Sequence, residues 1–131
     1  MPLQVELVSP ERILYSGEAD MVIARTVGGG DIAFLPGHAP FVGALQIATV
    51  TVRSGGHDEL VAVHGGFVEV SNDTVTILSD VAELASQIDV NRARQAQETA
   101  QSALREGDDA EAAAALRRAN VRIDVAEGAT V

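Results

Sequence analysis

The residues best suited to binding a charged ligand are two pairs in the last third of the sequence. Asp89 and Arg92 are three residues apart, and Arg118 and Arg122 are four apart. Side chains at these spacings share one face of a helix. Arginine binds phosphate oxygens through paired hydrogen bonds, and a neighbouring aspartate accepts hydrogen bonds from a ribose or a base amine. The pattern is therefore compatible with a nucleotide clamp.

The same residues also have a purely structural interpretation. Asp89 suits the N-cap of a helix, with an arginine three residues later as a local partner. Arg117, Arg118 and Arg122 would then form a solvated basic stripe that pairs with the acidic residues Glu111 and Asp124. The residue types alone leave both interpretations open.

A third candidate lies in the first half of the chain, where Gly30–Pro40 is dense in turn-forming residues. Pro36-Gly37 and Ala39-Pro40 predict a rigid surface loop with His38 at its tip. One interpretation is a structural turn. The other is a docking loop in which Asp31 and His38 face a partner.

No pattern predicts a metal centre or a catalytic site. The three histidines, His38, His57 and His64, have no ligand-like spacing, and the chain has no cysteine. The glycines at 28–30 lack the Gly-Lys-Ser/Thr ending of a phosphate loop, and no Ser/His/Asp constellation stands in a recognisable context. We expect no enzyme, no metal site and no required cofactor.

The elements that position these residues change character at Asp89. Before it lie ten of the twelve glycines, all four prolines and every aromatic residue, whereas the 42 residues after it hold twelve alanines. We expect a β-domain over residues 1–86 and an alanine-rich helical arm over residues 87–131. Such an architecture suits a protein that docks on a partner and moves an arm.

The β-domain shows period-two alternation and turn signals every 8–12 residues, which predicts eight to ten short strands in a sandwich or flattened barrel. The expected strand segments are 3–7, 12–16, 20–27, 34–35, 46–53, 59–64, 67–70 and 74–78. Gly65-Gly66 is expected to interrupt the strands on either side of it. No helical pattern separates the strands, which disfavours a parallel βαβ fold.

The residue pattern of the arm predicts two antiparallel helices joined at Glu106–Asp109. Gly107 is expected as the C-cap of the first helix, and Asp108 or Asp109 as the N-cap of the second. The expected seams are Ala93, Ala96, Ala100 and Ala103 in the first helix, and Ala112, Leu116, Ala119, Ile123 and Ala126 in the second. Each buried methyl contributes only ~0.8 kcal/mol. We therefore expect a hairpin that is docked in one state and opened in another, with a frayed tail over Glu127–Val131.

Charge and composition restrict the partners. The net charge of −10 is concentrated in the front half, which argues against nucleic acid and anionic lipid. The lack of cysteine fits a reducing compartment. No apolar run approaches the ~20 residues of a membrane span, and the N-terminus lacks a signal-peptide pattern. We expect a cytosolic protein that is peripheral to a larger structure.

Taken in order, four segments carry a resemblance over nearly the whole chain. They are Leu35–Pro40, Val63–Val70, Val75–Asp80 and Ile88–Ala93. With a β-front and a two-helix back, the chain resembles the epsilon subunits of bacterial F-type ATP synthases. The resemblance implies a flattened ten-stranded β-sandwich followed by an antiparallel two-helix hairpin. It also implies a non-catalytic rotor subunit of the central stalk, at the cytoplasmic face of the plasma membrane within the F1 sector.

The resemblance further implies partners. The sandwich would join the gamma subunit to the ring of c subunits, and the extended hairpin would reach the alpha and beta subunits and restrain ATP hydrolysis. The implied c-ring docking loop comprises Asp31, Pro36, Gly37, His38 and Pro40. The implied beta-subunit contacts are Arg117, Arg118 and Arg122.

ATP is implied as a weak regulatory ligand of the folded hairpin. The positions that match its contacts are Glu83, Asp89, Arg92, Arg118 and Arg122. The chain departs from ATP-binding members at Thr99, where they carry a further arginine. Two alternatives outside this family are a free-standing β-sandwich ligand-binding protein with a helical lid and an enzyme that uses the acidic strands.

Overall fold

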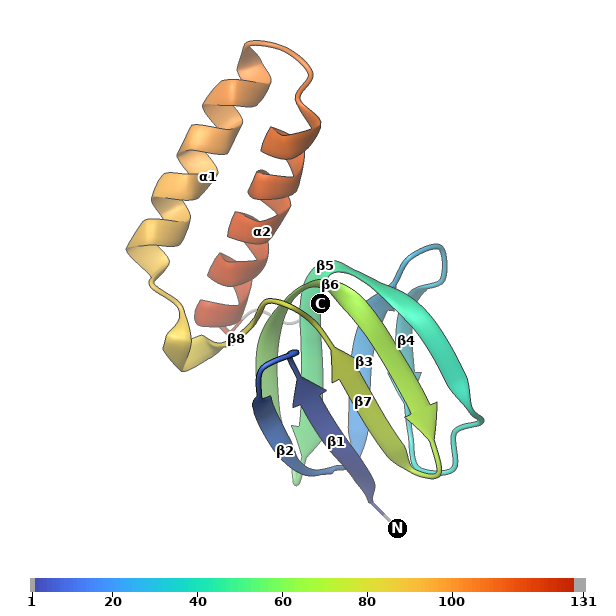
Figure 1. Ribbon diagram of the computed structural model, residues 1–131. Coiled ribbons are helices and arrows are strands. Elements are labelled where there is room, and N and C mark those ends of the chain that lie inside the picture. Colours follow the sequence, from blue (N-terminus) through green and yellow to red (C-terminus); the bar gives the residue numbers. More distant parts are fainter. Residues whose placement is uncertain (1, 129–131) are drawn as a thin grey trace.

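The computed structural model describes residues 2–128 and contains a β-sandwich followed by a two-helix hairpin (Figure 1). This arrangement confirms the fold expected from the sequence. Residues 129–131 of the tail expected to fray lie outside the described residues.

The strands of the sandwich form one continuously hydrogen-bonded sheet that folds over on itself. They are β1 (Leu3–Val8), β2 (Ile13–Ala19), β3 (Met21–Thr26), β4 (Gly30–Phe34), β5 (Phe41–Ser54), β6 (His57–Ser71), β7 (Thr74–Leu78) and β8 (Ala82–Leu84). Their order is β2-β1-β7-β6-β5-β3-β4, with β8 beside β6. The β1–β7 pair is parallel and the other pairs are antiparallel.

The two long strands, β5 and β6, belong to both layers of the sandwich. The first half of β5 and the second half of β6 join β7, β1 and β2, while their other halves join β3, β4 and β8. The pairing of β5 with β6 skips one position between Leu45↔Gly66 and Ile47↔His64. The expected interruption at Gly65-Gly66 is therefore a bend within one strand. The described residues form eight strands, and counting the halves of β5 and β6 separately accounts for the expected ten.

Gly66 is required at this bend. Its φ is +111°, and a Cβ at this position would lie 2.0 Å from the carbonyl oxygen of Leu78. A side chain therefore cannot be placed here without moving the neighbouring strand. The bend brings apolar side chains of both layers together in one core, in which Phe34, Val63 and Val68 are fully buried.

The helices begin where the sequence predicts. The carboxylates of Asp89 and Asp109 accept hydrogen bonds of 3.1 Å from the amides of Arg92 and Ala112. They cap α1 (Val90–Arg105) and α2 (Ala110–Ala126), and a short 3-10 turn, η1 (Ala85–Gln87), links β8 to α1. Asp109 rather than Asp108 is the second N-cap.

The seam between α1 and α2 is partly as predicted. Ala93 and Ala100 in α1 are buried, as are Ala112, Ala119 and Ile123 in α2. Ala96 is exposed, so its assignment to the seam is wrong, because the helix turns it toward a cavity. Ala103, Leu116 and Ala126 are only half-buried. A hydrogen bond of 2.8 Å from Gln97 to Asn120 joins the helices near the middle of the seam.

A second face of α2, which the alanine seam does not predict, packs on the sandwich. Val121 and Val125 are buried against Leu60 and Ala62 of β6, with Ile47 of β5 packed beside them. The helix α2 therefore lies between α1 and the sandwich, and α1 lies on its far side (Figure 1). This contact holds the hairpin in the docked position.

Candidate functional site

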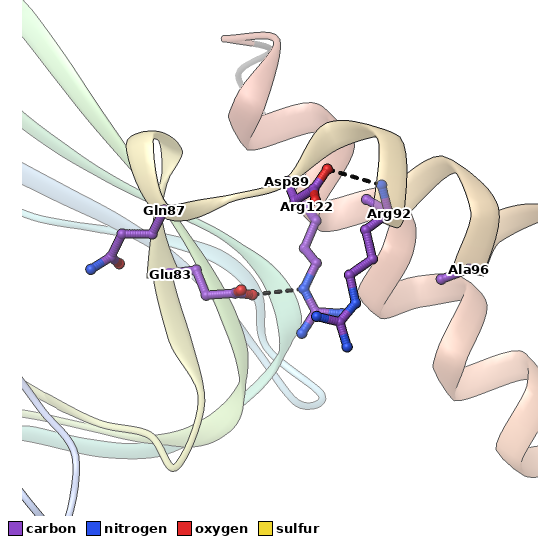
Figure 2. Close-up of a pocket in the computed structure, with 7 residues that line it drawn as sticks. Glu83, Gln87, Asp89, Arg92, Ala96 and Arg122 are labelled. Carbon is purple, nitrogen blue, oxygen red and sulfur yellow. Dashed lines mark hydrogen bonds and ion pairs between the residues drawn. The ribbon is translucent and has the colours of Figure 1, made fainter.

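A cavity of about 370 Å³ lies where the hairpin meets the sandwich (Figure 2). Its lining comes from four elements that are consecutive or adjacent in the fold: β8, η1, the first turns of α1, and α2. The lining residues are Glu83, Gln87, Asp89, Arg92, Ala93, Ala96 and Arg122. Docking of α2 against the sheet is therefore what completes the cavity.

Local hydrogen bonds fix the turn that leads into the cavity. The side-chain Oε1 of Gln87 accepts a bond of 2.9 Å from the backbone amide of Leu84. The carboxylate of Asp89 is engaged at the α1 N-terminus. These contacts set the direction in which the chain leaves β8 and so determine where α1 begins and where Arg92 lies.

Glu83 connects three elements through one oxygen atom. Its Oε1 accepts a bond of 2.7 Å from Nε of Arg122 on α2 and one of 3.0 Å from Nε2 of His64 on β6. All three side chains are largely buried. The Glu83–Arg122 ion pair therefore links the sandwich to the hairpin directly.

The surroundings of this group change the protonation of its members. Burial lowers the pKa of His64, and the positive charges of Arg122 and Arg118 lower it further against the opposing effect of Glu83. Burial by itself would raise the pKa of Glu83, but the hydrogen bonds from Arg122 and His64 outweigh it, so the pKa of Glu83 is lowered. At neutral pH the group holds an ionised carboxylate, a guanidinium and a neutral imidazole.

The cavity leaves guanidinium donors free. The guanidinium groups of Arg92 and Arg122, which both line the cavity, lie side by side (Figure 2). Arg92 forms no ion pair within residues 2–128, and Arg122 uses only its Nε toward Glu83. Because the carboxylates of Asp89 and Glu83 already accept hydrogen bonds, the unused donors suit an anion with several oxygens, such as a phosphate group.

Four of the five residues predicted to contact ATP meet at this cavity: Glu83, Asp89, Arg92 and Arg122. Arg118 is absent from the lining, since it pairs with Glu111 at 2.8 Å. Thr99 lines a different hollow on α1, with Gln95, Glu98 and Ser102. The expected set is thus largely assembled by the fold, with Arg118 one helical turn from Arg122.

Two residues of this region were missed. They are Gln87, which no sequence pattern marks, and His64, whose spacing from the other histidines indicates no metal site. His64 and Glu83 are 19 residues apart and meet because β6 and β8 pair with Ala62 opposite Glu83. No local sequence signal reports such a register.

Comparison with protein families gives a consistent result over both parts of the chain. Residues 2–85 match the family model "ATP synthase, Delta/Epsilon chain, beta-sandwich domain", and residues 86–127 match "ATP synthase, Delta/Epsilon chain, long alpha-helix domain". The chain belongs to the ATP synthase delta/epsilon family. This result confirms the resemblance noted in the sequence.

Curated members of the family are close relatives. The ATP synthase epsilon chain of Streptomyces griseus is 48% identical over 122 residues, covering 92% of each chain. That of Halalkalibacterium halodurans is 46% identical over 129 residues, covering 95% of this chain and 96% of the relative. The chain is therefore a non-catalytic subunit of an ATP synthase, which disfavours both the free-standing ligand-binding protein and the enzyme.

Solved structures support the fold of this family member. A chain in the Euglena gracilis mitochondrial ATP synthase, in a structure of its OSCP, F1 and c-ring, superposes with a TM-score of 0.72 at 21% identity. The match covers 96% of this chain and 78% of that one. A chain in the central stalk and c-ring structure of the Tetrahymena thermophila enzyme gives 0.57 at 16% identity, covering 100% and 98%.

Of the five residues that the family resemblance assigns to one docking loop, four lie in the turn after β4 and Asp31 lies apart from them. Asp31 lies on β4, where its carboxylate pairs with Arg25 of β3 at 2.9 Å. The residues from Pro36 to Pro40 follow the other end of β4. A single loop over Gly30–Pro40 is therefore wrong in extent, because hydrogen bonding to β3 makes its first half a strand.

His38 is also less exposed than a loop tip would be. It is half-buried, with its ring centroid 5.0 Å from that of Phe34 and 6.4 Å from that of Phe41. Its amide donates a bond of 3.0 Å to the carbonyl oxygen of Leu35, which confirms a tight turn. The aromatic contacts anchor His38 to the core, whereas the rest of the turn, Leu35, Pro36, Gly37, Ala39 and Pro40, is exposed.

Residues 2–128 bring together no three histidine, aspartate or glutamate side chains that could hold a metal ion. Neither α1 nor α2 is long and apolar enough to cross a membrane.

Proposed function

We propose that this family member joins the gamma subunit to the c ring in the rotor, as a peripheral protein at the cytoplasmic face of the plasma membrane. Family membership and the similarity to chains solved within F1/c-ring assemblies support this role. The observation that carries the proposal is an uncovered apolar row on the sandwich, on the layer that does not receive the hairpin.

The apolar row crosses five strands. It consists of Ala44, Phe67, Leu78, Val8 and Ile13, each a direct cross-strand partner of the next. Direct partners project from the same face of a sheet, and this face is the one opposite the core. The exposed fractions of Phe67, Leu78 and Ile13 are 56%, 45% and 61%.

A continuous exposed apolar surface of this kind marks an interaction site. A hollow of about 460 Å³ lies beside it, lined in part by Val8, Phe67 and Leu78. We assign the apolar row as the surface that binds the gamma subunit. The hairpin then docks on one layer of the sandwich, and gamma binds the other layer.

The test is binding of purified gamma to the full chain carrying F67S and L78S together. Both side chains are exposed, so the fold is expected to persist while binding falls at least tenfold. The variant V27S removes an equally exposed valine away from the apolar row and should bind gamma normally. Unchanged binding of the double variant would reject the apolar row as the docking surface.

For the c ring, we retain the two ends of β4 as separate contacts. The Leu35–Pro40 turn is braced by a bond of 2.7 Å from the amide of Gly37 to the carboxylate of Asp73, and Asp31 lies at the opposite end of the strand. We expect L35D to weaken assembly with the c ring without lowering the melting temperature. Normal assembly of L35D would count against the contact at the Leu35–Pro40 turn, and normal assembly of D31N would count against the contact at Asp31.

The hairpin is proposed to restrain ATP hydrolysis when it extends toward the alpha and beta subunits. In the docked position Arg118 and Arg122 are engaged by Glu111 and Glu83, while Arg117 is exposed. Extension breaks the contact with Glu83 and frees Arg122 beside the exposed Arg117, whereas the Arg118–Glu111 pair lies within α2. Exposed ion pairs contribute only ~0–1 kcal/mol each, so their combined effect is what shifts the equilibrium.

The assay is ATP hydrolysis by the assembled synthase. R117Q/R118Q/R122Q should relieve inhibition while leaving synthesis nearly intact, and higher salt should reproduce part of the relief. Deletion of residues 88–131 gives the maximal relief. If that deletion leaves hydrolysis unchanged, the hairpin does not restrain this enzyme.

ATP is proposed as a weak regulatory ligand of the docked hairpin, bound through the donors of Arg92 and Arg122. The cavity volume of about 370 Å³ falls within the range of small-molecule sites. Titration of the isolated chain with ATP should shift the backbone NMR signals of Arg92 and Arg122 and leave Arg105 unaffected. Uniform or absent shifts would reject the site.

A further inference from the structure

The contact that holds the hairpin to the sandwich includes a histidine that the proposed function does not use. One carboxylate oxygen of Glu83 is shared by Arg122 of the hairpin and His64 of the sandwich. We call these three residues the hairpin latch. Any change in the charge of His64 acts on the same atom that binds Arg122.

The surroundings of His64 disfavour protonation of its ring. Its side chain is only 3% exposed, and its Nδ1 is fully buried with no hydrogen-bond partner within the described chain. In the neutral ring Nε2 donates to Glu83, and Nδ1 carries a lone pair. Protonation would turn Nδ1 into a buried donor without an acceptor, which is unfavourable.

The charges that face His64 come from several elements. Glu83 on β8 favours the protonated ring, whereas Arg118 and Arg122 on α2 oppose it. Asp80, in the turn after β7, lines the same hollow as His64. The cross-strand partner of His64 on β5 is the uncharged Ile47. Only the two arginines leave when the hairpin opens, together with the cover that α2 provides.

We propose that His64 makes docking of the hairpin sensitive to pH, so that protonation of its ring weakens the hold of Glu83 on Arg122 and releases α2 from the sandwich. Release in itself is a property of the isolated chain. Its consequence for ATP hydrolysis rests on the proposed function of the extended hairpin.

The direction follows from proton linkage. In the docked state, burial and the two arginines lower the pKa of His64. Opening removes much of both effects and lets the pKa return toward its ordinary value of ~6.5. The docked state therefore binds fewer protons, its stabilisation is complete above the ordinary pKa, and that stabilisation is lost as the pH falls. The opening constant rises by up to about tenfold for each pH unit between the two pKa values.

Glu83 acts in the same direction at lower pH. Its pKa is lowered in the docked state by the bonds from Arg122 and His64. Opening removes the arginine, so acid again favours the open state. A variant that removes only the histidine should therefore shift acid release to lower pH rather than abolish it.

The experiment uses the full chain, whose lack of cysteine allows two labels at chosen sites. Cysteines replacing the exposed residues Glu106 in the interhelical turn and Glu59 on β6 would report the distance between hairpin and sandwich. We expect the distance to grow on acidification from about pH 7.5 to about pH 5. H64Q keeps an amide donor for Glu83 without a titrating ring, and it should stay docked over this range. H57Q, which removes the exposed His57, is the matched control and should open like the unmodified chain.

The unmodified chain gives a second measurement. The NMR signal of the His64 ring should titrate together with the label distance. Titration of His64 without opening, or equal acid release in H64Q, would overturn the proposal. In the assembled synthase, acid should reduce hydrolysis more in the unmodified chain than in H64Q. If acid opens the isolated chain but hydrolysis is indifferent to H64Q, the hairpin latch stands and the proposed restraint of hydrolysis fails.

Discussion

The contact between α2 and the sandwich should decide how firmly the hairpin is docked, and truncating it provides a quantitative test. Val121 and Val125 are 8% and 1% exposed against the outer face of β6. Changing both to alanine deletes four buried methyl groups at ~0.8 kcal/mol each, or about 3 kcal/mol in total. Since every 1.4 kcal/mol is tenfold, V121A/V125A should raise the opening constant roughly a hundredfold.

Hydrogen exchange of the α2 amides measures this change. Helices of this length are marginal in water without packing, so the α2 amides should exchange when the hairpin leaves the sandwich. In V121A/V125A they should exchange roughly a hundredfold faster, while amides of β1 and β7 keep their rates. V27A deletes the same atoms from an exposed valine and should change neither set.

Two results would refute the reasoning. A change in α2 below about threefold would mean that this packing does not hold the hairpin, and that the ion pair of Glu83 or the seam with α1 does. A parallel acceleration of the sandwich amides would mean that the two parts open as one cooperative unit.

Three further outcomes are expected. Residues 1–86 alone should melt cooperatively although Leu60 and Ala62 become exposed, and a chain that is unfolded at about 25 °C would contradict independent folding. G66A should lower the free energy of unfolding by about 3 kcal/mol or more in chemical denaturation, because the new Cβ meets the carbonyl oxygen of Leu78. In the control G37A the new Cβ points into open space, so the free energy of unfolding should fall by only about 1–2 kcal/mol. D109A should cost about 1 kcal/mol through loss of the α2 cap, and D108A should have nearly no effect on the same denaturation curve.

The features predicted correctly are those that a few consecutive residues determine. Asp89 and Asp109 cap the helices because their carboxylates reach amides three residues later. The change at Asp89 from turn-rich to alanine-rich sequence likewise predicts the boundary between strands and helices. These are local interactions, and the sequence displays them without knowledge of the fold.

The features missed depend on which strand lies beside which. Asp31 follows three glycines and so suggests a loop, yet Arg25 lies directly opposite on β3 and makes its segment a strand. His64 meets Glu83 only through the register of β6 with β8. Val121 and Val125 form a second apolar face on a helix whose alanine seam already accounts for one face. Such long-range pairings are not encoded in the spacing of neighbouring residues.

The bend that takes β5 and β6 through both layers has a mechanical consequence. In a sandwich held only by side-chain contacts, a sideways load on one layer is resisted by packing forces alone. Here the layers share two covalent strands that remain hydrogen-bonded to each other on both sides of Gly66. Shear between the layers would have to stretch the backbone itself. The sandwich should therefore behave as a stiff block.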